Sequence, residues 1–174
     1  MSNELPVIYL ARHGETAWSL SGQHTGLTDL PLTERGEQNA RALGQRLKGL
    51  NFVKVLTSPL QRARRTCEMA GFATAAGVDR DLLEWNYGQY EGLRTAKIHA
   101  ERPAWQLFRD GCPGGESPDQ VRADRVVGRV LAARWLGLEV LGTWNWARCW
   151  LSALSQNSRA RKNPHSVIMV QRTT

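Results

Sequence analysis

The sequence contains few cysteines, and they are too scattered to form a cross-linked framework. Cys67, Cys112 and Cys149 are odd in number and far apart in a chain of 174 residues, whereas disulfide scaffolds and structural zinc sites need paired or closely spaced thiols. The chain also lacks an apolar run near the roughly 18 residues of a membrane-spanning helix, and its first residues lack the basic lead of a secretory signal. We therefore expect reduced thiols, a cytoplasmic location and no membrane partner.

Acidic residues are missing from one end of the chain. Residues 140–174 hold 5 Lys and Arg and no Asp or Glu, whereas residues 1–139 hold 18 basic and 16 acidic residues. The formal net charge of +7 is therefore mostly a property of this segment. Its one short basic cluster, NSRARKNPH, is not the long basic stripe with interleaved aromatics that binds nucleic acid, so nucleic acid is not favoured as a partner.

The same change in composition marks the one candidate domain boundary. Residues 1–139 have the length for a single hydrophobic core, whereas residues 140–174 crowd Trp144, Trp146 and Trp150 together and have no clear amphipathic period. We predict one folded domain over 1–139, followed by a divergent, basic, Trp-rich tail. The sequence leaves the oligomeric state open, and a homo-oligomer is one alternative.

The first half of the chain alternates apolar runs with helical patterns. PVIYLA at 6–11 and FVKVLTS at 52–58 are short runs with β-branched residues, typical of buried strands. Thr33 can cap a helix between them, and Ser58 can cap a second helix that ends near Gly71. This rhythm predicts an α/β protein, a three-layer α/β/α structure with a mostly parallel sheet, whose ligands bind beyond the carboxyl ends of the strands.

An arginine, a histidine and a glycine follow the first predicted strand directly. The neutral imidazole of His13 has a nitrogen that can act as a nucleophile, the guanidinium of Arg12 can neutralise a phosphoryl group, and Gly14 permits close backbone approach. A histidine at a strand end is also common as ordinary hydrogen-bonded structure. Taken alone, these three residues leave chemistry and structure as alternatives.

Two further segments carry charged residues in patterns that suit phosphate chemistry. In SPLQRARRT, Arg62 lies in the first turn of the predicted helix, where the positive helix end favours an anion, and Arg65 and Thr66 can share its face. In LLEWNYGQYEGL, Glu84 and Glu91 lie among aromatic residues and glycines, a partly apolar setting in which either could serve as a general acid. A solvated basic face and ordinary surface carboxylates are the alternatives.

The order and spacing of these segments resemble the histidine phosphatase superfamily, which includes the cofactor-dependent phosphoglycerate mutases. The resemblance rests on RHGETAW, GQHTGLTDLPLTERGEQNA, SPLQRARRT, LLEWNYGQYEGL and GCPGGES, and it covers residues 6–120. Within the superfamily, GQHTGLTDLPLT, EWNYGQYEG and RDGCPGGES are most similar to small bacterial acid phosphatases and fungal sedoheptulose bisphosphatase-like members.

The resemblance implies a role for each residue singled out above. His13 would attack phosphorus and become a phosphohistidine that water hydrolyses, while Arg12 and Arg62 hold the phosphoryl oxygens. Glu84 would protonate the leaving oxygen and then activate water. The resemblance also implies a substrate position lined by Ser19, Thr25, Gly26 and Tyr87. A small phosphorylated molecule is the implied substrate, with no metal ion and no other cofactor.

One part of the family's pattern is missing. Its members carry a second histidine in a strand-then-HGH segment, and His24, His99 and His165 lie in no such motif. His24 lies in the long loop, where it could touch substrate or face water, and His165 precedes an apolar run and is a poor substitute. A helix predicted to begin at Ser117 runs into GRVLAARWLGLE, which resembles the family's sequence just after the missing motif, so we predict an internal truncation near 126–129 and a fold incomplete at its C-terminal end.

The missing histidine leaves three functional alternatives. The leading prediction is a phosphomonoesterase that acts on small phosphorylated metabolites with weakened activity, because loss of one preorganised transition-state donor costs about 10²–10³ in rate. The second is a catalytically dead remnant that binds phosphate or a partner. The third is a phosphoglycerate mutase, although mutases carry extra water-excluding segments for which 174 residues leave no room. We also expect low stability, since removal of a central strand exposes unpaired backbone edges.

Overall fold

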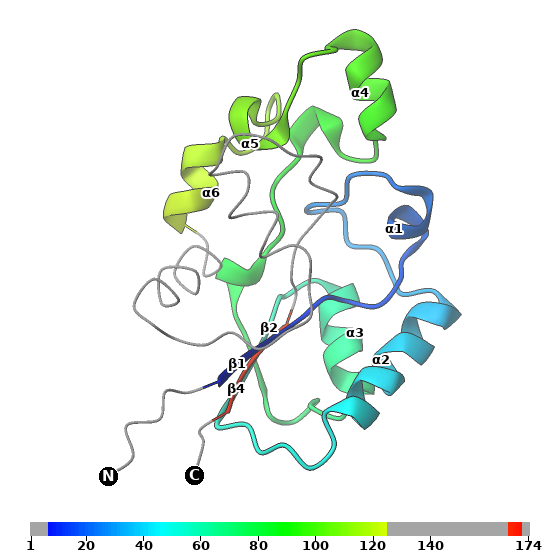
Figure 1. Cartoon of the computed structure of the whole chain (residues 1–174), viewed down its shortest axis with the longest axis vertical. Helices are drawn as coiled ribbons and strands as arrows, with labels where there is room; N and C mark the ends of the chain where they lie inside the picture. The colour runs from blue at the N-terminus through cyan, green and yellow to red at the C-terminus, as the bar shows by residue number, and fades with distance from the viewer. Residues whose placement is uncertain (1–6, 125–166, 172–174) are drawn as a thin grey trace.

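The sheet contains four described strands, three of which point in the same direction. The structure, a computed structural model, describes residues 7–124 and 167–171 (Figure 1). The strand order is β1-β4-β2-β3, where β2 and β3 are parallel and β4 is antiparallel to both β1 and β2. The strands are β1 (Val7–Ala11), β2 (Lys54–Thr57), β3 (Ala76–Val78) and β4 (Val167–Gln171). The predicted α/β class with a mostly parallel sheet is confirmed.

β4 comes from residues 140–174, the segment that we predicted to be a divergent tail. It lies between β1 and β2, with Val167 opposite both Ala11 and Thr57. A central strand suits a continuous apolar run, which VIMV provides without the alternation that marks a half-buried strand. β4 therefore begins at the edge of the sheet where β1 and β2 end.

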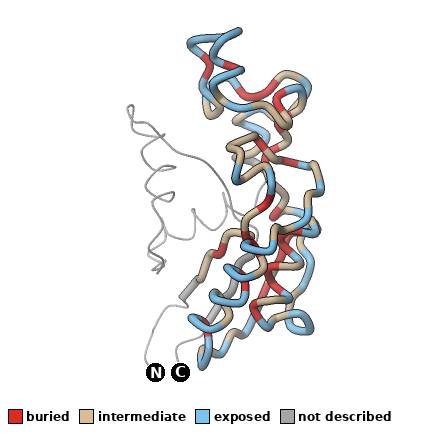
Figure 2. Tube along the Cα trace, turned by 90° about the vertical axis from the view of Figure 1, so that its right-hand side faces the viewer, coloured by how far each residue is buried: buried red, intermediate tan, exposed pale blue. Residues whose placement is uncertain are grey.

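Two apolar clusters hold the described residues together. The first, which we call the sheet cluster, contains buried Ala11, Leu47, Val55 and Cys67. The second, which we call the aromatic cluster, contains buried Trp85, Tyr87, Tyr90, Ile98, Trp105 and Cys112. Figure 2 shows buried residues in the lower half of the molecule, which holds the sheet, and again in the upper half.

Two helices, α2 (Glu34–Arg46) and α3 (Gln61–Met69), lie side by side on one face of the sheet (Figure 1). α2 begins after Thr33, whose side chain accepts a hydrogen bond from the Gly36 amide at 3.0 Å, as predicted. The side of α2 that meets the sheet is apolar, since Leu43 packs against the sheet cluster and Leu47, directly after the helix, is buried in it. We predicted three layers. Within residues 7–124 and 167–171 the structure describes two of them, the sheet and this layer of helices.

The predicted start of α3 is wrong. Ser58 and Pro59 have the pattern of a local cap, yet α3 spans Gln61–Met69 with Leu60 at its N-cap and no side-chain cap of its own. The carboxylate of Asp29 accepts from the Gln61 amide at 2.7 Å, so a loop residue distant in sequence replaces the local cap. The predicted end near Gly71 is confirmed, because the helix stops before this glycine, which has φ +93°.

The end of β1 is pressed against the first turn of α2. A Cβ atom added to Gly14 would lie 2.2 Å from the Gly36 carbonyl oxygen, and one added to Gly36 would lie 2.2 Å from the Glu15 carbonyl oxygen. Glycine is therefore required on both sides of this contact, since a side chain would push the two segments apart. The contact fixes the residues after β1 relative to α2.

Four short elements contribute residues to the aromatic cluster or pack against it. They are the 3₁₀ turn Gly88–Tyr90, α4 (Thr95–Glu101), α5 (Leu107–Asp110) and α6 (Pro118–Asp124), and a further 3₁₀ turn, Arg80–Leu82, precedes them in the chain. α6 begins after Ser117, as predicted, with a capping box in which the Ser117 amide donates to the Gln120 side chain at 2.8 Å and the Gln120 amide donates to the Ser117 hydroxyl at 3.3 Å.

Several predictions fall outside the described residues. These are the continuation of the last helix, the truncation near 126–129, and the positions of Cys149 and His165. No helix within the described ranges is both long enough and apolar enough to span a membrane.

Candidate active site

His13 lies just beyond β1 with one ring nitrogen already bonded. Its Nδ1 is 2.7 Å from the Gly14 carbonyl oxygen, and since a carbonyl only accepts, Nδ1 carries the ring proton. Burial, with smaller contributions from the positive charges of Arg12 and Arg62, lowers the pKa of His13 to about 3 despite the opposing Gly14 hydrogen bond. The imidazole is thus neutral near physiological pH, and Nε2 holds an electron pair that can attack an electrophile.

A threonine links the His13 segment to α3. The Gly14 amide donates to the Thr66 hydroxyl at 2.9 Å, and that hydroxyl donates to the Arg62 carbonyl oxygen at 2.7 Å. A buried hydroxyl that both accepts and donates fixes its two neighbours in one geometry. Thr66 therefore sets the spacing between His13 and Arg62, a role that the helical pattern alone did not specify.

Arg62 is buried and held by backbone carbonyl groups. It is 2% exposed, its Nη1 donates to the Thr28 carbonyl at 2.8 Å, and its Nη2 donates to the Gly26 carbonyl at 2.7 Å. Burial lowers the pKa of Arg62, while nearby carboxylates, led by Glu84, act in the opposite direction. A guanidinium has further N–H groups beyond these two, and they can bind an anion.

Arg12 contributes a buried donor. Its Nε is inaccessible to solvent and has no hydrogen-bond partner among the described residues. Arg12 and His13 line a cavity of about 800 Å³ together with Ser19 of α1 (Ala17–Ser21) and apolar residues of α2 such as Leu43. A guanidinium N–H without a partner, beside a neutral imidazole, suits an anionic ligand.

The structure separates the two carboxylates that the sequence left as alternatives. Glu91 accepts from two loop amides through one oxygen, the nearer being that of Gly26 at 2.7 Å. Glu84 accepts from the amide of the next residue at 3.0 Å and is the leading negative charge acting on Arg62. Of these two carboxylates, Glu84 therefore has the stronger electrostatic effect on Arg62, whereas Glu91 holds the loop.

Ser19 and Thr25, two of the predicted lining residues, have hydroxyl groups bonded to nearby backbone. The Ser19 hydroxyl donates to the Thr16 carbonyl at 3.0 Å and accepts from the Thr16 amide at 2.8 Å, within the cap of α1. The Thr25 hydroxyl donates to the Gln23 carbonyl at 3.3 Å. Ser19 lines the cavity beside His13, whereas Thr25 does not.

Gly26 and Tyr87, the other two predicted lining residues, meet at the boundary of the aromatic cluster. A Cβ atom on Gly26 would lie 2.1 Å from the Trp85 carbonyl oxygen and 3.0 Å from a Tyr87 ring carbon, so no larger residue fits. Tyr87 is fully buried, and its ring packs against His24 with centroids 4.7 Å apart. Tyr87 thus supports the loop from behind, and His24 does not face water.

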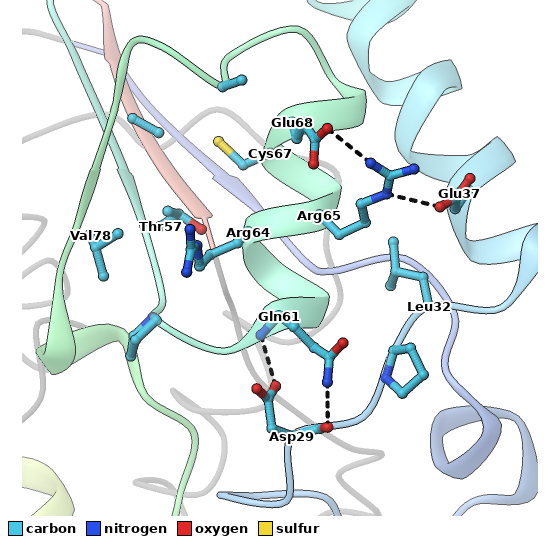
Figure 3. Close-up of a pocket in the computed structure, with 14 residues that line it drawn as sticks. Asp29, Leu32, Glu37, Thr57, Gln61, Arg64, Arg65, Cys67, Glu68 and Val78 are labelled. Atoms are coloured by element: carbon cyan, nitrogen blue, oxygen red, sulfur yellow. Dashed lines mark hydrogen bonds and ion pairs between the residues drawn. The ribbon is translucent and has the colours of Figure 1, made fainter.

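Arg65 lies apart from this group, on the side of α3 that faces α2 (Figure 3). Its guanidinium is paired with Glu37 and Glu68 at 2.9 Å each, beside a second cavity of about 620 Å³ (Figure 3). Its side chain is 40% exposed, where water and salt weaken ion pairs. The alternative of a solvated basic face therefore fits Arg65. Arg62 is buried and does not lie on such a face, and its anion-binding role stays a prediction.

The described cysteines are poor competitors for the role of nucleophile. Cys67 and Cys112 are free and buried, and burial raises the pKa of Cys67 to about 11 and that of Cys112 to about 12. Within residues 7–124 and 167–171, no group of three His, Cys, Asp or Glu side chains is arranged to hold a metal ion. Among the described residues, the neutral ring of His13 is therefore better suited to act as a nucleophile than either of these protonated thiols.

The chain matches a known family over most of its length. A sequence model of the histidine phosphatase superfamily (branch 1) matches residues 8–135. The chain belongs to the histidine phosphatase superfamily. This confirms the resemblance carried by the motifs, and the range that matches the superfamily includes His13, Arg62 and Glu84 and ends before the tail begins.

Relatives within the superfamily have several names. The chain is 44% identical over 128 residues to an acid phosphatase of Mycobacterium tuberculosis and 38% identical over 156 residues to sedoheptulose 1,7-bisphosphatase of Saccharomyces cerevisiae. These matches cover 71% and 75% of this chain but 63% and 57% of the relatives, so the chain spans about three fifths of their length.

Solved structures agree with this assignment. The protein of an open reading frame of Mycobacterium tuberculosis aligns with a TM-score of 0.66 at 38% identity, over 76% of this chain and 68% of that one. A phosphoglycerate mutase of Thermus thermophilus aligns with a TM-score of 0.55 at 35% identity, over 74% of this chain and 71% of that one. The histidine phosphatase fold is thus shared with both.

Proposed function

We propose that this histidine phosphatase is a phosphomonoesterase that hydrolyses small phosphorylated metabolites through a phosphohistidine on His13. One observation carries the proposal. The His13 ring is neutral, its Nδ1 is bonded to the Gly14 carbonyl at 2.7 Å, and the charges of Arg12 and Arg62 act on it. The names of the relatives, acid phosphatase and sedoheptulose 1,7-bisphosphatase, support the same class of reaction.

The first step transfers the phosphoryl group to the protein. The Nε2 electron pair of His13 forms a bond to phosphorus while the bond from phosphorus to the substrate oxygen breaks. Glu84 gives its proton to that oxygen, so the product leaves as an alcohol. Arg12 and Arg62 neutralise the charge on the equatorial oxygens, which is the main contribution a protein makes to phosphoryl transfer.

The second step restores the protein. Glu84, now a carboxylate, takes a proton from water as the water oxygen bonds to phosphorus. The bond between phosphorus and Nε2 breaks, its electron pair returns to His13, and inorganic phosphate leaves. The buried loop residue Gly26 and the cavity residue Ser19 would shape the space for the rest of the substrate, with Thr25 and Tyr87 near them.

We expect this activity to be weaker than in members of the family with a second histidine. The sequence between Asp124 and Val167 contains no HGH motif. By analogy with other preorganised donors, the loss of one costs about 10²–10³ in rate.

The test is to trap the phosphoenzyme in the full chain. A ³²P-labelled phosphate ester is mixed with the protein, and the reaction is quenched in alkali, in which phosphohistidine survives. We expect a label that is lost in acid, and loss of both label and turnover by at least about 10³-fold in His13→Ala. His99→Ala, an exposed histidine on α4, is the matched control.

Three results would contradict the proposal. A label that persists in His13→Ala would place the nucleophile elsewhere. Saturable phosphate binding without label or turnover would support a catalytically dead remnant. With 3-phosphoglycerate as substrate, an isomer formed without free phosphate would support a mutase, the activity named for the Thermus thermophilus structure.

A further inference from the structure

The loop from Gly26 to Thr28 is held from two opposite sides. Its carbonyl groups accept from α3, since Arg62 donates to the oxygens of Gly26 and Thr28 at 2.7 and 2.8 Å. Its amides donate toward the aromatic cluster, since those of Gly26 and Thr28 both bond to one carboxylate oxygen of Glu91, at 2.7 and 3.1 Å. Arg62 and Glu91 therefore hold the same two residues.

Asp29 ties this loop to α3 a second time. Its carboxylate accepts from the Gln61 amide at 2.7 Å, and its carbonyl accepts from the Gln61 side chain at 2.6 Å (Figure 3). The end of the loop is thus attached to the residue that directly precedes Arg62. Movement of the loop would be transmitted to the start of α3.

The backbone around Glu91 is itself anchored. The Gly92 amide donates to the His24 carbonyl, and the His24 amide donates to the Leu93 carbonyl, both at 2.8 Å. Gly92 has φ +76°, and a Cβ atom there would lie 3.0 Å from the Trp18 ring, so this backbone is confined. The carboxylate of Glu91 therefore approaches the loop from a fixed direction.

From this geometry we infer that Glu91 is a positioning residue, which sets the Arg62 guanidinium by holding the loop whose carbonyl groups Arg62 binds. The inference rests on the proposed function, in which Arg62 binds the phosphoryl group. Arginine has a long side chain with many rotamers, so fixed acceptors are what make its N–H groups point in one direction before the ligand arrives. Glu91 acts through the loop and does not touch the substrate.

Geometry and charge predict opposite results when Glu91 is removed. Glu91 is one of the carboxylates whose charge acts on Arg62. If only that charge mattered, its loss would make Arg62 more attractive to an anion. If the clamp matters, its loss frees two loop amides, lets the carbonyl partners of Arg62 move, and weakens anion binding.

The experiment compares two variants of Glu91 in the full chain. Glu91→Gln keeps an oxygen that can accept from both amides, whereas Glu91→Ala removes it. Orthovanadate, a mimic of the phosphoryl group, is titrated calorimetrically, and hydrogen exchange is measured at the amides of Gly26 and Thr28. Glu101→Ala, an exposed carboxylate at the end of α4, is the matched control and should change neither measurement.

We expect Glu91→Ala to weaken orthovanadate binding about 10-fold and to speed exchange of both amides by a similar factor. Glu91→Gln should stay within about 3-fold of the wild type in both. If the alanine variant does not fold, Glu91→Ser replaces it, because a serine hydroxyl is too short to span both amides.

Unchanged or tighter orthovanadate binding in Glu91→Ala overturns the inference. Equal weakening in Glu91→Gln and Glu91→Ala also overturns it, because the clamp geometry would then not be the cause. A wild-type chain that binds no orthovanadate and forms no phosphohistidine contradicts the proposed function, and the exchange rates then decide the clamp alone. Faster hydrogen exchange at the amides of Gly26 and Thr28 in Glu91→Ala supports the clamp, and unchanged exchange rates overturn it.

Discussion

The sheet cluster and the aromatic cluster supply different parts of the site, and they do so by different means. The sheet cluster joins strands and long helices, and His13 and Arg62 lie at the end of β1 and the start of α3. The aromatic cluster joins short helices and turns, and Glu84 and Glu91 lie on a segment whose one regular element is the 3₁₀ turn Gly88–Tyr90. Backbone hydrogen bonds thus position His13 and Arg62, the proposed nucleophile and cation, whereas ring packing positions Glu84, the proposed acid. We expect single substitutions to damage the aromatic half more.

The largest effect should come from removing a ring of the aromatic cluster. Trp105 is 5% exposed, its Nε1 donates to the Gly111 carbonyl at 2.8 Å, and its ring lies 5.2 Å from that of Tyr90. We expect Trp105→Ala to lower the free energy of unfolding by about 3–5 kcal/mol, measured by urea denaturation. The control Val53→Ala, at a side chain 62% exposed, should change it by less than about 0.5 kcal/mol. A loss below about 1 kcal/mol for Trp105→Ala would contradict the contrast between the halves.

An intermediate effect should appear in the sheet half when the pH falls. The pKa of His13 is about 3 in the folded chain, below the ordinary value of 6.5. Between these values the unfolded chain binds a proton that the folded chain does not. The free energy of unfolding therefore rises with pH across this window, and this gain in stability is lost as the pH falls through it. One pH unit inside this window corresponds to about 1.4 kcal/mol, so we expect the free energy of unfolding to fall by about 2–3 kcal/mol between pH 6.5 and pH 4.5.

This pH dependence is measured as the urea midpoint at a series of pH values. His13→Asn removes the titrating ring, so its stability should fall less steeply below pH 6.5, the ordinary pKa of the ring. Equal slopes for the two proteins would show that the His13 ring is not buried in its neutral form.

The smallest effect should come from the loop that joins the halves. Asp29→Ala removes the acceptor of the Gln61 amide, and the loss of a helix cap costs about 1 kcal/mol. Asp29→Asn keeps an acceptor and should stay within about 0.5 kcal/mol of the wild type. Thermal unfolding of both variants measures the difference. Equal destabilisation by the two substitutions would mean that charge, and not the cap, is what Asp29 contributes.

The regular half could be predicted from the sequence because its signals are local. The strands at 6–11 and 52–58, the cap at Thr33 and the apolar spacing of α2 depend on residues a few positions apart. The predicted start of α3 is wrong because the contact that decides it is not local. Ser58 and Pro59 are good local signals, but Asp29 bonds to Gln61 across 32 residues and decides where the helix begins.

The rest of the site depends on contacts between distant residues. Glu84 and Glu91 have similar surroundings in the sequence. What distinguishes them is contact with distant residues, since Glu91 accepts from the Gly26 and Thr28 amides, 65 and 63 residues away. The linking role of Thr66 likewise requires Gly14 to lie beside it, 52 residues away. The family resemblance could name His13, Arg12, Arg62 and Glu84 because a family motif keeps the residues that meet in the folded site, even where they are far apart in sequence. Their roles stay predictions.

The pairing of β1 with β4 joins residues 7–11 to residues 167–171, and within the described residues it is the pairing that attaches β1 to the rest of the sheet. Translation makes β1 first and β4 last, so the ribosome must deliver nearly all of the described chain before this ladder can form. Until then the apolar strand β1 lacks its pairing partner β4, and the closure of so long a loop is slow. The interval between synthesis and closure is when we expect chaperone binding or aggregation to compete with folding.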